Sequence, residues 1–395
     1  MFNQKIVESL GKSSMIRAMF EAGAKLKAQY GDENVFDFSL GNPDIEPPAQ
    51  VQESIRKYAN SETPGLHHYM NNAGYQDVRA KVAEHLQKKS GIPLTHENIL
   101  MVCGAAAGMN VALKALLNPG EEVIVLSPFF VEYLSYIENA DGKPVIVKTE
   151  KDTFQIDTEA VKNSITPKTK GIILNSPNNP TGVVYSGESL ERLREAIEEK
   201  EKEFGTNIFI LSDEPYVSIV YDGVELPNML TVFKNCIVIN SFSKSHALPG
   251  ERIGYVATSS RIDDVSTLMA AMITLNRTLG FVNAPALFQK VVAENLDVAV
   301  DTGFYQEKRD ILYNHITSMG FECVKPEGAF YLFMKSPVED DVAFCETAQK
   351  YNLLIVPGSG FGCPGYVRIA YCYDTPMIKR SLPAFTNLAK EYGLI

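Results

Sequence analysis

The sequence predicts an α/β protein whose larger part is built on a mostly parallel β-sheet between helices. Short apolar runs rich in Val and Ile recur along the middle of the chain, and segments of helical character separate them. Runs of this kind are typical of strands buried on both faces, as in parallel sheets. The alternation of strand and helix favours crossover β-α-β units.

Seven of these runs are expected to form the sheet, each as a buried strand. They cover residues 98–103, 122–127, 144–149, 171–175, 208–213, 236–241 and 253–257. Two of the segments between them are good helix candidates. Residues 107–118 are apolar and rich in Ala, and residues 188–205 carry a strongly amphipathic pattern. A seven-stranded sheet flanked by helices is therefore expected.

The two ends of the chain have a different pattern, which predicts a second, smaller domain. Residues 14–31 form a helix pattern that Gly31 ends, and the C-terminal part mixes long helical segments with the strand-like "GAFYLFMK" and "YVRIAY". We therefore assign residues 46–290 to a large sheet domain, and residues 1–45 together with 291–395 to a small α+β domain.

Composition excludes several classes of protein. Of the 395 residues, 45% are hydrophobic and 22% are charged, as in ordinary globular proteins, and no apolar stretch is long enough to cross a bilayer. The net charge of −11 and the lack of a basic cluster argue against nucleic-acid binding. Lys5, Glu8 and Lys12 lie where a signal peptide would have its apolar core, so we expect a cytoplasmic location.

The six cysteines lie far apart in the sequence, with no CxxC pair, and no histidine has the spacing of a metal ligand. This pattern argues against a disulfide framework and against a structural zinc site. We therefore expect reduced cysteines that serve in packing, and no metal ion.

The position of Lys244 needs an explanation. It directly follows the apolar run 236–240 and lies between two serines, in "SFSKSHALPGERIGY". Burying an ammonium group costs free energy unless the group has a partner or a chemical role. Open α/β sheets bind their ligands beyond the carboxyl ends of the strands, so the residues that follow the other strands bear on this question.

Small or polar residues follow three other strands. Gly104, Ala105 and Ala106 follow the first and open a helix, so that backbone amides could approach a phosphate group. Asn179 lies in a Pro-rich loop after a second strand, and Asp213 ends a third. Each feature has an ordinary alternative, because small residues often form a tight turn and an aspartate often caps a helix.

Together these residues describe a site for a phosphorylated cofactor that forms an imine with lysine. Pyridoxal phosphate needs an amine for its aldehyde, an anion opposite its pyridinium nitrogen, and donors for its phosphate. Lys244 supplies the amine and Asp213 the anion. Arg252 supplies a bidentate phosphate partner, and Ser241 and Ser243 supply hydroxyl groups. The sequence therefore predicts a pyridoxal phosphate site at one edge of the sheet.

The motifs that carry these residues resemble the signatures of the fold-type I, class I pyridoxal-phosphate aminotransferases, of the aspartate aminotransferase type. The matching segments, in the order that the family has them, are "FSLGNPDIEPP", "HHYMNNAGYQDVR", "SPFFVEY", "NSPNNPTG", "SDEPY", "SFSKSHALPGERIGY", "GAFYLF" and "VPGSGFGCPGYVRIAY". The resemblance covers nearly the whole chain.

The resemblance implies a role for each matching residue around the cofactor. Lys244 would form the internal aldimine and then act as the base that moves a proton from the amino-acid Cα to the cofactor. Asp213 would keep the pyridine nitrogen protonated, and Asn179 and Tyr216 would hydrogen-bond the phenolic oxygen. Phe130 would stack on the pyridine ring, with a core phenylalanine as the alternative.

Other matching residues would bind the substrate or a second subunit. Arg368 would bind the α-carboxylate through its guanidinium fork, with a structural ion pair as the alternative. The backbone of Gly41 would touch the same carboxylate, and Asn179 would also contact the substrate. Tyr69 would reach the cofactor phosphate of the neighbouring subunit, which implies a homodimer with shared active sites.

The side-chain pocket, which differs between members of the family, sets the amino donor. Arg277 lies close to the position at which dicarboxylate-specific relatives use an arginine of the partner subunit, offset by about one residue, and a surface charge is the alternative. We therefore expect amino transfer, in two ping-pong half-reactions, between aspartate and a 2-oxo acid such as 2-oxoglutarate.

Other functions remain open at this point. The donor could be alanine, an aromatic or another neutral amino acid, or the enzyme could be a β-eliminating C–S lyase that uses nearly the same residues. A lyase would release pyruvate from cystathionine without a keto-acid acceptor. A non-enzymatic regulator with this fold should lack the lysine or the aspartate, and both Lys244 and Asp213 are present.

Overall fold

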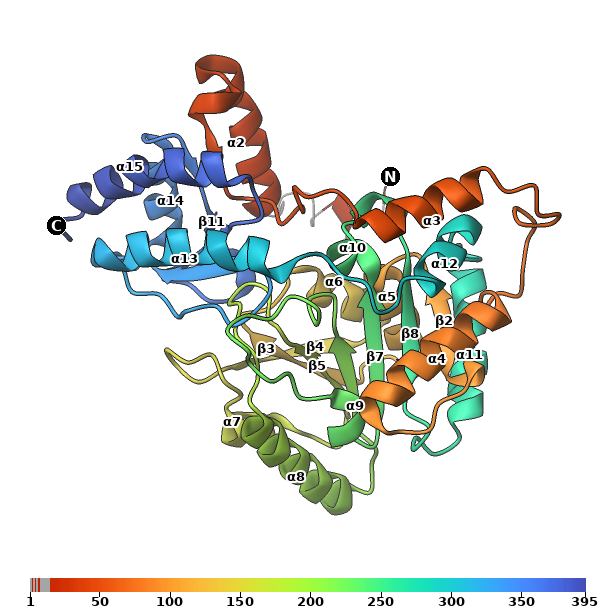
Figure 1. The fold of residues 1–395 in the computed structure, drawn as a ribbon. Coiled ribbons are helices and arrows are strands. Elements are labelled where there is room, and N and C mark those ends of the chain that lie inside the picture. The colour runs from red at the N-terminus through yellow and green to blue at the C-terminus, as the bar shows by residue number, and fades with distance from the viewer. Residues whose placement is uncertain (1, 3, 5, 8–14) are drawn as a thin grey trace.

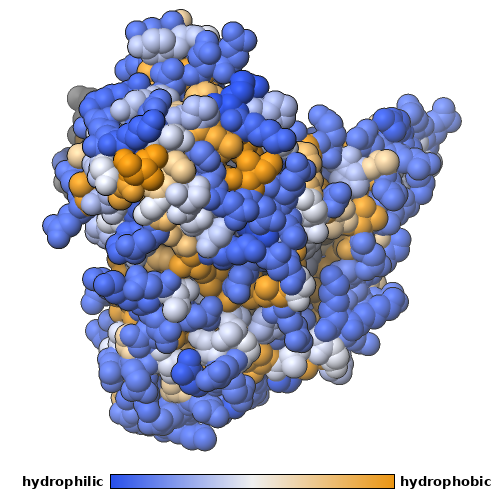
Figure 2. Space-filling view, turned by 60° about the vertical axis from the view of Figure 1, so that its left-hand side comes forward, coloured by the Kyte–Doolittle hydropathy of each residue, from blue (hydrophilic) through white to orange (hydrophobic). Residues whose placement is uncertain are grey.

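The computed structural model describes residues 2, 4, 6–7 and 15–395 (Figure 1). A large sheet with helices packed on it forms the body of the molecule, and a smaller group of helices and short strands lies above it at the upper left of the view. Polar residues cover most of the face seen in Figure 2, where apolar residues form only scattered groups. Among the described helices, none has both the length and the apolar character that a membrane span requires.

The large sheet has seven strands in the order β2-β8-β7-β6-β5-β3-β4. Strands β4, β3, β5, β6 and β7 are parallel to one another, and β8 is antiparallel to both β7 and β2. The mostly parallel seven-stranded sheet that the sequence predicts is therefore confirmed. The strands are β2 (Ile99–Val102), β3 (Glu122–Ser127), β4 (Lys143–Lys148), β5 (Thr169–Asn175), β6 (Phe209–Asp213), β7 (Cys236–Ser241) and β8 (Gly254–Thr258).

The expectation that residues 144–149 form a strand buried on both faces is wrong. The corresponding strand, β4, is the last in the sheet. Among the described strands it pairs with β3 alone, and most of its side chains are partly or fully exposed. Ile146 is 51% exposed, whereas Val147 is buried. The Val and Ile residues of this run fit an edge strand as well as a central one, because both favour β-branched side chains.

The sheet is covered by helices on both faces. Side chains of β2 alternate between two apolar clusters, with Ile99 and Met101 in one and Leu100 and Val102 in the other. The first cluster includes residues of α4 (Gln76–Ser90) and α8 (Gly187–Phe204), and the second includes residues of α5 (Ala105–Leu116) and α11 (Val265–Thr278). Burial on both faces explains why the central strands are apolar throughout.

Within the part of the chain that the structure describes, two short sheets and four α-helices make up the smaller group. Strand β1 (Phe36–Asp37) pairs in parallel with β10 (Leu353–Leu354), and β11 (Val356–Pro357), β12 (Tyr366–Ala370) and β9 (Tyr331–Lys335) form an antiparallel sheet. The helices are α2 (Met15–Tyr30), α13 (Thr302–Ser318), α14 (Asp341–Gln349) and α15 (Thr375–Glu391). The N-terminal helix expected over residues 14–31 is thus confirmed.

All seven strands of the large sheet lie within residues 46–290, and every strand of the two short sheets lies outside them. We keep the division into a large and a small domain as a prediction. The other helices are α3 (Ala49–Ala59), α6 (Glu132–Asn139), α7 (Thr158–Ser164), α9 (Met229–Val232), α10 (Phe242–Ser245) and α12 (Ala286–Ala293), and short 3₁₀ turns cover Asp32–Asn34, His96–Asn98, Pro249–Glu251 and Gly358–Phe361.

Gly254 permits a close packing of strand ends that the site requires. It begins β8, pairs with Val102 on one side and with Ser241 on the other, and is buried. A Cβ atom there would overlap the carbonyl oxygen of Asn240 and lie 3.3 Å from the carbonyl carbon of Gly104. Only a residue without a side chain fits between these backbone atoms.

Gly254→Ala is expected to lower the free energy of unfolding by about 2 kcal/mol, because backbone atoms would have to move apart. Urea unfolding of the purified variant measures this loss. Gly250→Ala is the matched control, since a Cβ atom at Gly250 has no neighbour within 4 Å. Equal stability of the two variants would contradict the packing argument.

Candidate active site

A cavity of about 320 Å³ opens at the carboxyl ends of the central strands. Its walls come from the large sheet and from the smaller group of elements, because Gly41, Tyr331 and Arg368 line it together with residues of the large sheet. It brings together most of the residues that the sequence singled out: Gly41, Ala105, Ala106, Phe130, Asn179, Asp213, Tyr216, Ser241, Ser243, Lys244, Arg252 and Arg368.

Strand register explains why these residues meet. Asp213 at the end of β6 lies opposite Asn175 at the end of β5, and β7 ends at Ser241, just before the one-turn helix α10 that carries Lys244. Strand β2 also ends at this edge, because β8 is antiparallel to both β2 and β7. Ligand sites in open sheets form at this edge of the strands.

One end of the cavity gathers donors for an anion. Gly104 is the N-cap of α5 and has a φ angle of 80°, in the region that favours glycine. The amide groups of Ala105 and Ala106 begin the helix and have no carbonyl partner within it. A Cβ atom at Gly104 would lie 2.5 Å from Nη2 of Arg252, so glycine lets the guanidinium approach the helix end. The hydroxyl-bearing Ser241 and Ser243 complete a group that fits a phosphate.

Lys244 is buried in the cavity and is held by a backbone carbonyl. Its Nζ donates a hydrogen bond of 2.7 Å to the carbonyl oxygen of Gly41 and lies 5.4 Å from the ring centre of Phe330. Burial lowers the pKa of Lys244 to about 8, and the positive charges of Arg368 and Arg252 act in the same direction. Near neutral pH a usable fraction of this amine is therefore uncharged, as a nucleophile or a base requires.

Asp213 lies in the cavity wall and has a tyrosine partner. Its carboxylate accepts a short hydrogen bond from the hydroxyl of Tyr133, and its backbone carbonyl accepts a bond of 2.9 Å from the amide of Asn175. Burial raises the pKa of Asp213 to about 6, and the Tyr133 hydrogen bond opposes this shift. The carboxylate is thus mostly ionised at neutral pH and can pair with a protonated ring nitrogen.

Arg368 is buried in β12 and has only neutral partners. Nη1 donates to Oδ1 of Asn179 at 3.1 Å, and Nη2 donates to the carbonyl oxygen of Ser39 at 2.6 Å. Within the described part of the chain its Nε has no hydrogen-bond partner, and no acidic side chain forms an ion pair with it. The structural ion pair considered as an alternative is therefore absent from the described residues, and the guanidinium can accept a carboxylate ligand.

Aromatic side chains surround these charged groups. The ring of Tyr331 lies 4.8 Å from the guanidinium carbon of Arg368, and its hydroxyl is 2.9 Å from that of Tyr216. A Cβ atom at Gly41 would overlap the Tyr331 hydroxyl, so glycine is required there. Phe130 is partly exposed and lines the cavity, with its ring 5.6 Å from that of Tyr133.

Sequence reasoning missed several residues of the cavity, among them Tyr133, Tyr136, Asn175 and Tyr331. Three of them lie inside motifs quoted above, and Asn175 is the first residue of "NSPNNPTG". Tyr133 ends "SPFFVEY" and Tyr331 lies in "GAFYLF". Tyr133 lies three residues after Phe130, the predicted stacking ring, and this closeness in the sequence could have identified it.

Three predicted site residues do not line the cavity of their own chain. Gly104 is buried at the N-cap of α5, next to the lining residue Ala105. Tyr69 is 92% exposed in the loop before α4, and Arg277 is exposed near the end of α11. The segments that carry them are nevertheless bonded to each other. The amide of Asn283 donates to the carbonyl oxygen of Asn71 at 2.9 Å, and other bonds join residues 72 and 276 and residues 72 and 282.

Comparison with known families decides the class of the protein. A model of the family "aminotransferase class I and II" matches residues 33–385, which is most of the chain. The chain belongs to this family. It is a pyridoxal-phosphate-dependent aminotransferase, as the resemblance of its motifs implies.

Similar proteins and structures agree with this assignment. An aspartate aminotransferase of Thermotoga maritima is 33% identical over 374 residues, which cover 93% of this chain and 95% of that protein. The structure of an aminotransferase from Eubacterium rectale has a TM-score of 0.96 and 42% identity and covers both chains fully. The Thermus thermophilus aspartate aminotransferase with maleate has a TM-score of 0.87 and 28% identity, covering 98% of this chain and 100% of that chain.

The cavity of this aminotransferase fits pyridoxal phosphate. The N-terminal end of α5 and the guanidinium of Arg252 offer hydrogen-bond donors to the phosphate. Asp213 offers an anion to the ring nitrogen, and Lys244 offers an amine to the aldehyde. When bound, the cofactor supplies a ring that withdraws the electrons left at the substrate Cα.

Tyr133→Phe removes the hydrogen bond that opposes the raised pKa of Asp213. The pKa of this carboxyl should rise further, so activity should be lost at a higher pH as the solution is acidified, and kcat/KM near neutral pH should fall by about tenfold. A pH–rate profile measures both effects. Tyr185→Phe is the control, because Tyr185 is buried away from the cavity, and an unchanged acid limb in Tyr133→Phe would contradict the assigned role.

Proposed function

We propose that this aminotransferase moves an amino group between L-aspartate and a 2-oxo acid such as 2-oxoglutarate. The observation that carries the proposal is the buried guanidinium of Arg368, which faces the cavity without an acidic partner among the described residues. A buried charge of this kind calls for an anionic ligand, and every amino-acid and 2-oxo-acid substrate has a carboxylate. The names of the Thermotoga and Thermus relatives support aspartate as the donor.

In this proposal Arg368 binds the substrate α-carboxylate with both of its outer nitrogens. Asn179 holds one of these nitrogens through its Oδ1 atom and so orients the guanidinium plane. The backbone of Gly41 lies at the same end of the cavity, where the Lys244 amine contacts its carbonyl oxygen. Substrate carboxylate and catalytic amine are thereby brought to one place, which favours reaction by orientation.

Lys244 then takes the proton from the substrate Cα with Nζ and returns a proton when the acceptor reacts. Its pKa of about 8 suits this role, because a base works best when its pKa is close to the working pH. The carboxylate of Asp213 holds the ring nitrogen in its protonated form. Tyr216, whose pKa burial raises well above the ordinary value, keeps its proton and donates a hydrogen bond to the phenolic oxygen, as does Asn179.

Phosphate binding is assigned to the amides at Gly104, Ala105 and Ala106, to Arg252, and to the hydroxyl groups of Ser241 and Ser243. The positive end of α5 and the guanidinium together neutralise a dianion. Phe130 closes the cavity above the ring by stacking.

We also propose a homodimer with shared active sites. The exposed segments that carry Tyr69 and Arg277 are joined by side-chain hydrogen bonds and so form one surface. Tyr69 would reach the phosphate of the partner subunit, and Arg277 would bind the second carboxylate of aspartate there. The cytoplasmic location inferred from the sequence remains a prediction.

Donor profiling tests the proposed substrate. Purified enzyme should use L-aspartate with a higher kcat/KM than alanine, aromatic or branched donors, and Arg277→Ala should lower the value for aspartate by about tenfold or more while leaving that for alanine unchanged. Steady-state assays with 2-oxoglutarate measure these ratios. No preference for acidic donors would reject aspartate, and pyruvate formed from cystathionine without an acceptor would indicate a C–S lyase.

Arg368→Lys tests the carboxylate site. A lysine keeps the charge but cannot form two parallel hydrogen bonds, so the KM for every amino donor should rise by about tenfold or more. Arg261→Lys is a control, because Arg261 bonds backbone carbonyls outside the cavity. An unchanged KM in Arg368→Lys would contradict the assignment.

A further inference from the structure

Two loop segments carry the tyrosines that meet beside Arg368. Residues 216–222 follow β6 and begin with Tyr216, and residues 326–331 lead into β9 and end with Tyr331. Backbone contacts join the two segments along their length. They are the bond from Tyr221 N to Glu327 O (2.8 Å), the bond from Ala329 N to Ile219 O (3.0 Å), and an antiparallel bridge between Val220 and Gly328.

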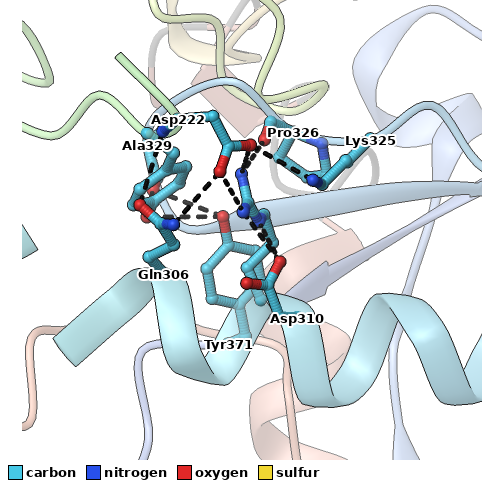
Figure 3. A network of polar contacts seen from close by, with 9 residues as sticks. Asp222, Gln306, Asp310, Lys325, Pro326, Ala329 and Tyr371 are labelled. Atoms are coloured by element: carbon cyan, nitrogen blue, oxygen red, sulfur yellow. Dashed lines mark hydrogen bonds and ion pairs between the residues drawn. The ribbon is translucent and has the colours of Figure 1, made fainter. Parts of the chain in front are cut away.

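Arg309 of α13 binds the far ends of both segments. Its side chain is fully buried, Nη1 and Nη2 donate to the carboxylate of Asp222 at 2.8 and 3.1 Å, and Nη1 also donates to the carbonyl oxygen of Pro326 at 2.9 Å. Figure 3 shows Asp222 at the centre of this network, with Lys325 and Gln306 as further partners. One guanidinium therefore fixes the two segments to the same helix.

Tyr221 ties the network to the segment that ends at Tyr331. Its ring lies 4.8 Å from the guanidinium carbon of Arg309, and its hydroxyl donates a short hydrogen bond to the carbonyl oxygen of Ala329. Ala329 has a φ of 57°, and Tyr371, also seen in Figure 3, contacts the same carbonyl at 3.4 Å. The chain is thus held firmly two residues before Tyr331.

We propose that Asp222 and Arg309 are positioning residues for the substrate carboxylate, because they hold Tyr331 against the guanidinium of Arg368. Neither residue lines the cavity, so both act through the two segments. The inference rests on the proposed role of Arg368 as the carboxylate site. Movement of the Tyr331 ring would release one face of that guanidinium and loosen its orientation toward a ligand.

The test compares two carboxylates that contact the same guanidinium. Asp222 and Asp310 both pair with Arg309, and their side chains are 40% and 39% exposed, but Asp310 belongs to α13 itself and holds neither segment. Asp222→Asn removes the charge and keeps a residue that tolerates the φ of 56° found there. Asp310→Asn is the matched control.

The measured quantities are the KM for L-aspartate, the inhibition constant of maleate, kcat and the melting temperature, all on the cofactor-loaded enzyme. Asp222→Asn should raise both the KM and the inhibition constant by about fivefold, with kcat changed by less than about twofold, and Asp310→Asn should leave them unchanged. Tyr221→Phe, which removes the bond to Ala329, should raise both constants in the same way and decides the matter if Asp222→Asn does not fold.

Unchanged constants in the variants that fold would overturn the inference, even with a lower melting temperature, because the network would then be structural only. An equal rise in Asp310→Asn would also overturn it. If the wild-type enzyme binds neither maleate nor aspartate but accepts other donors, the proposed aspartate specificity fails, and the KM for the best donor replaces that for aspartate in the comparison. If no amino acid or carboxylate binds, the assignment of Arg368 as the carboxylate site is rejected, and so is the inference that rests on it.

Discussion

The hydrogen bond from Lys244 to the carbonyl oxygen of Gly41 joins residues 203 positions apart in the sequence, and the site depends on it. The amine is useful because burial lowers its pKa, and the positive charge of Arg368 lowers it further. Its neighbours include Gly41 of the N-terminal segment and Phe330 of the C-terminal part of the chain. The chemistry of this residue therefore depends on how the chain ends pack over the sheet.

Local sequence patterns predict the fold well because the sheet is buried on both faces. The seven predicted strands match the observed ones to within two residues at each end. The error at β4 has a physical origin, since an apolar β-branched run does not reveal whether a second strand or solvent lies beside it. The positions of Lys244 and Asp213 beyond the strand ends could be predicted because parallel strands share one carboxyl edge.

Contacts between distant segments could not be predicted in the same way. Tyr133 and Tyr331 lie within recognisable motifs, but their hydrogen bonds to Asp213 and Tyr216 depend on how α6 and β9 pack. The pairing of Asp222 with Arg309 joins residues 87 positions apart on exposed and helical segments that carry no motif. A sequence pattern does not reveal which side chains of two distant elements point toward each other, so these contacts could be found only from the structure.

The close approach of Arg252 to Gly104 has a practical consequence for handling the protein. A guanidinium beside the positive end of α5 attracts any small dianion, including inorganic phosphate and sulfate. We expect such ions to compete with the cofactor for the same donors, so that buffers containing them slow reconstitution of the cofactor-free enzyme. The fraction of enzyme that carries the cofactor would then depend on the phosphate and sulfate to which the protein was exposed during purification.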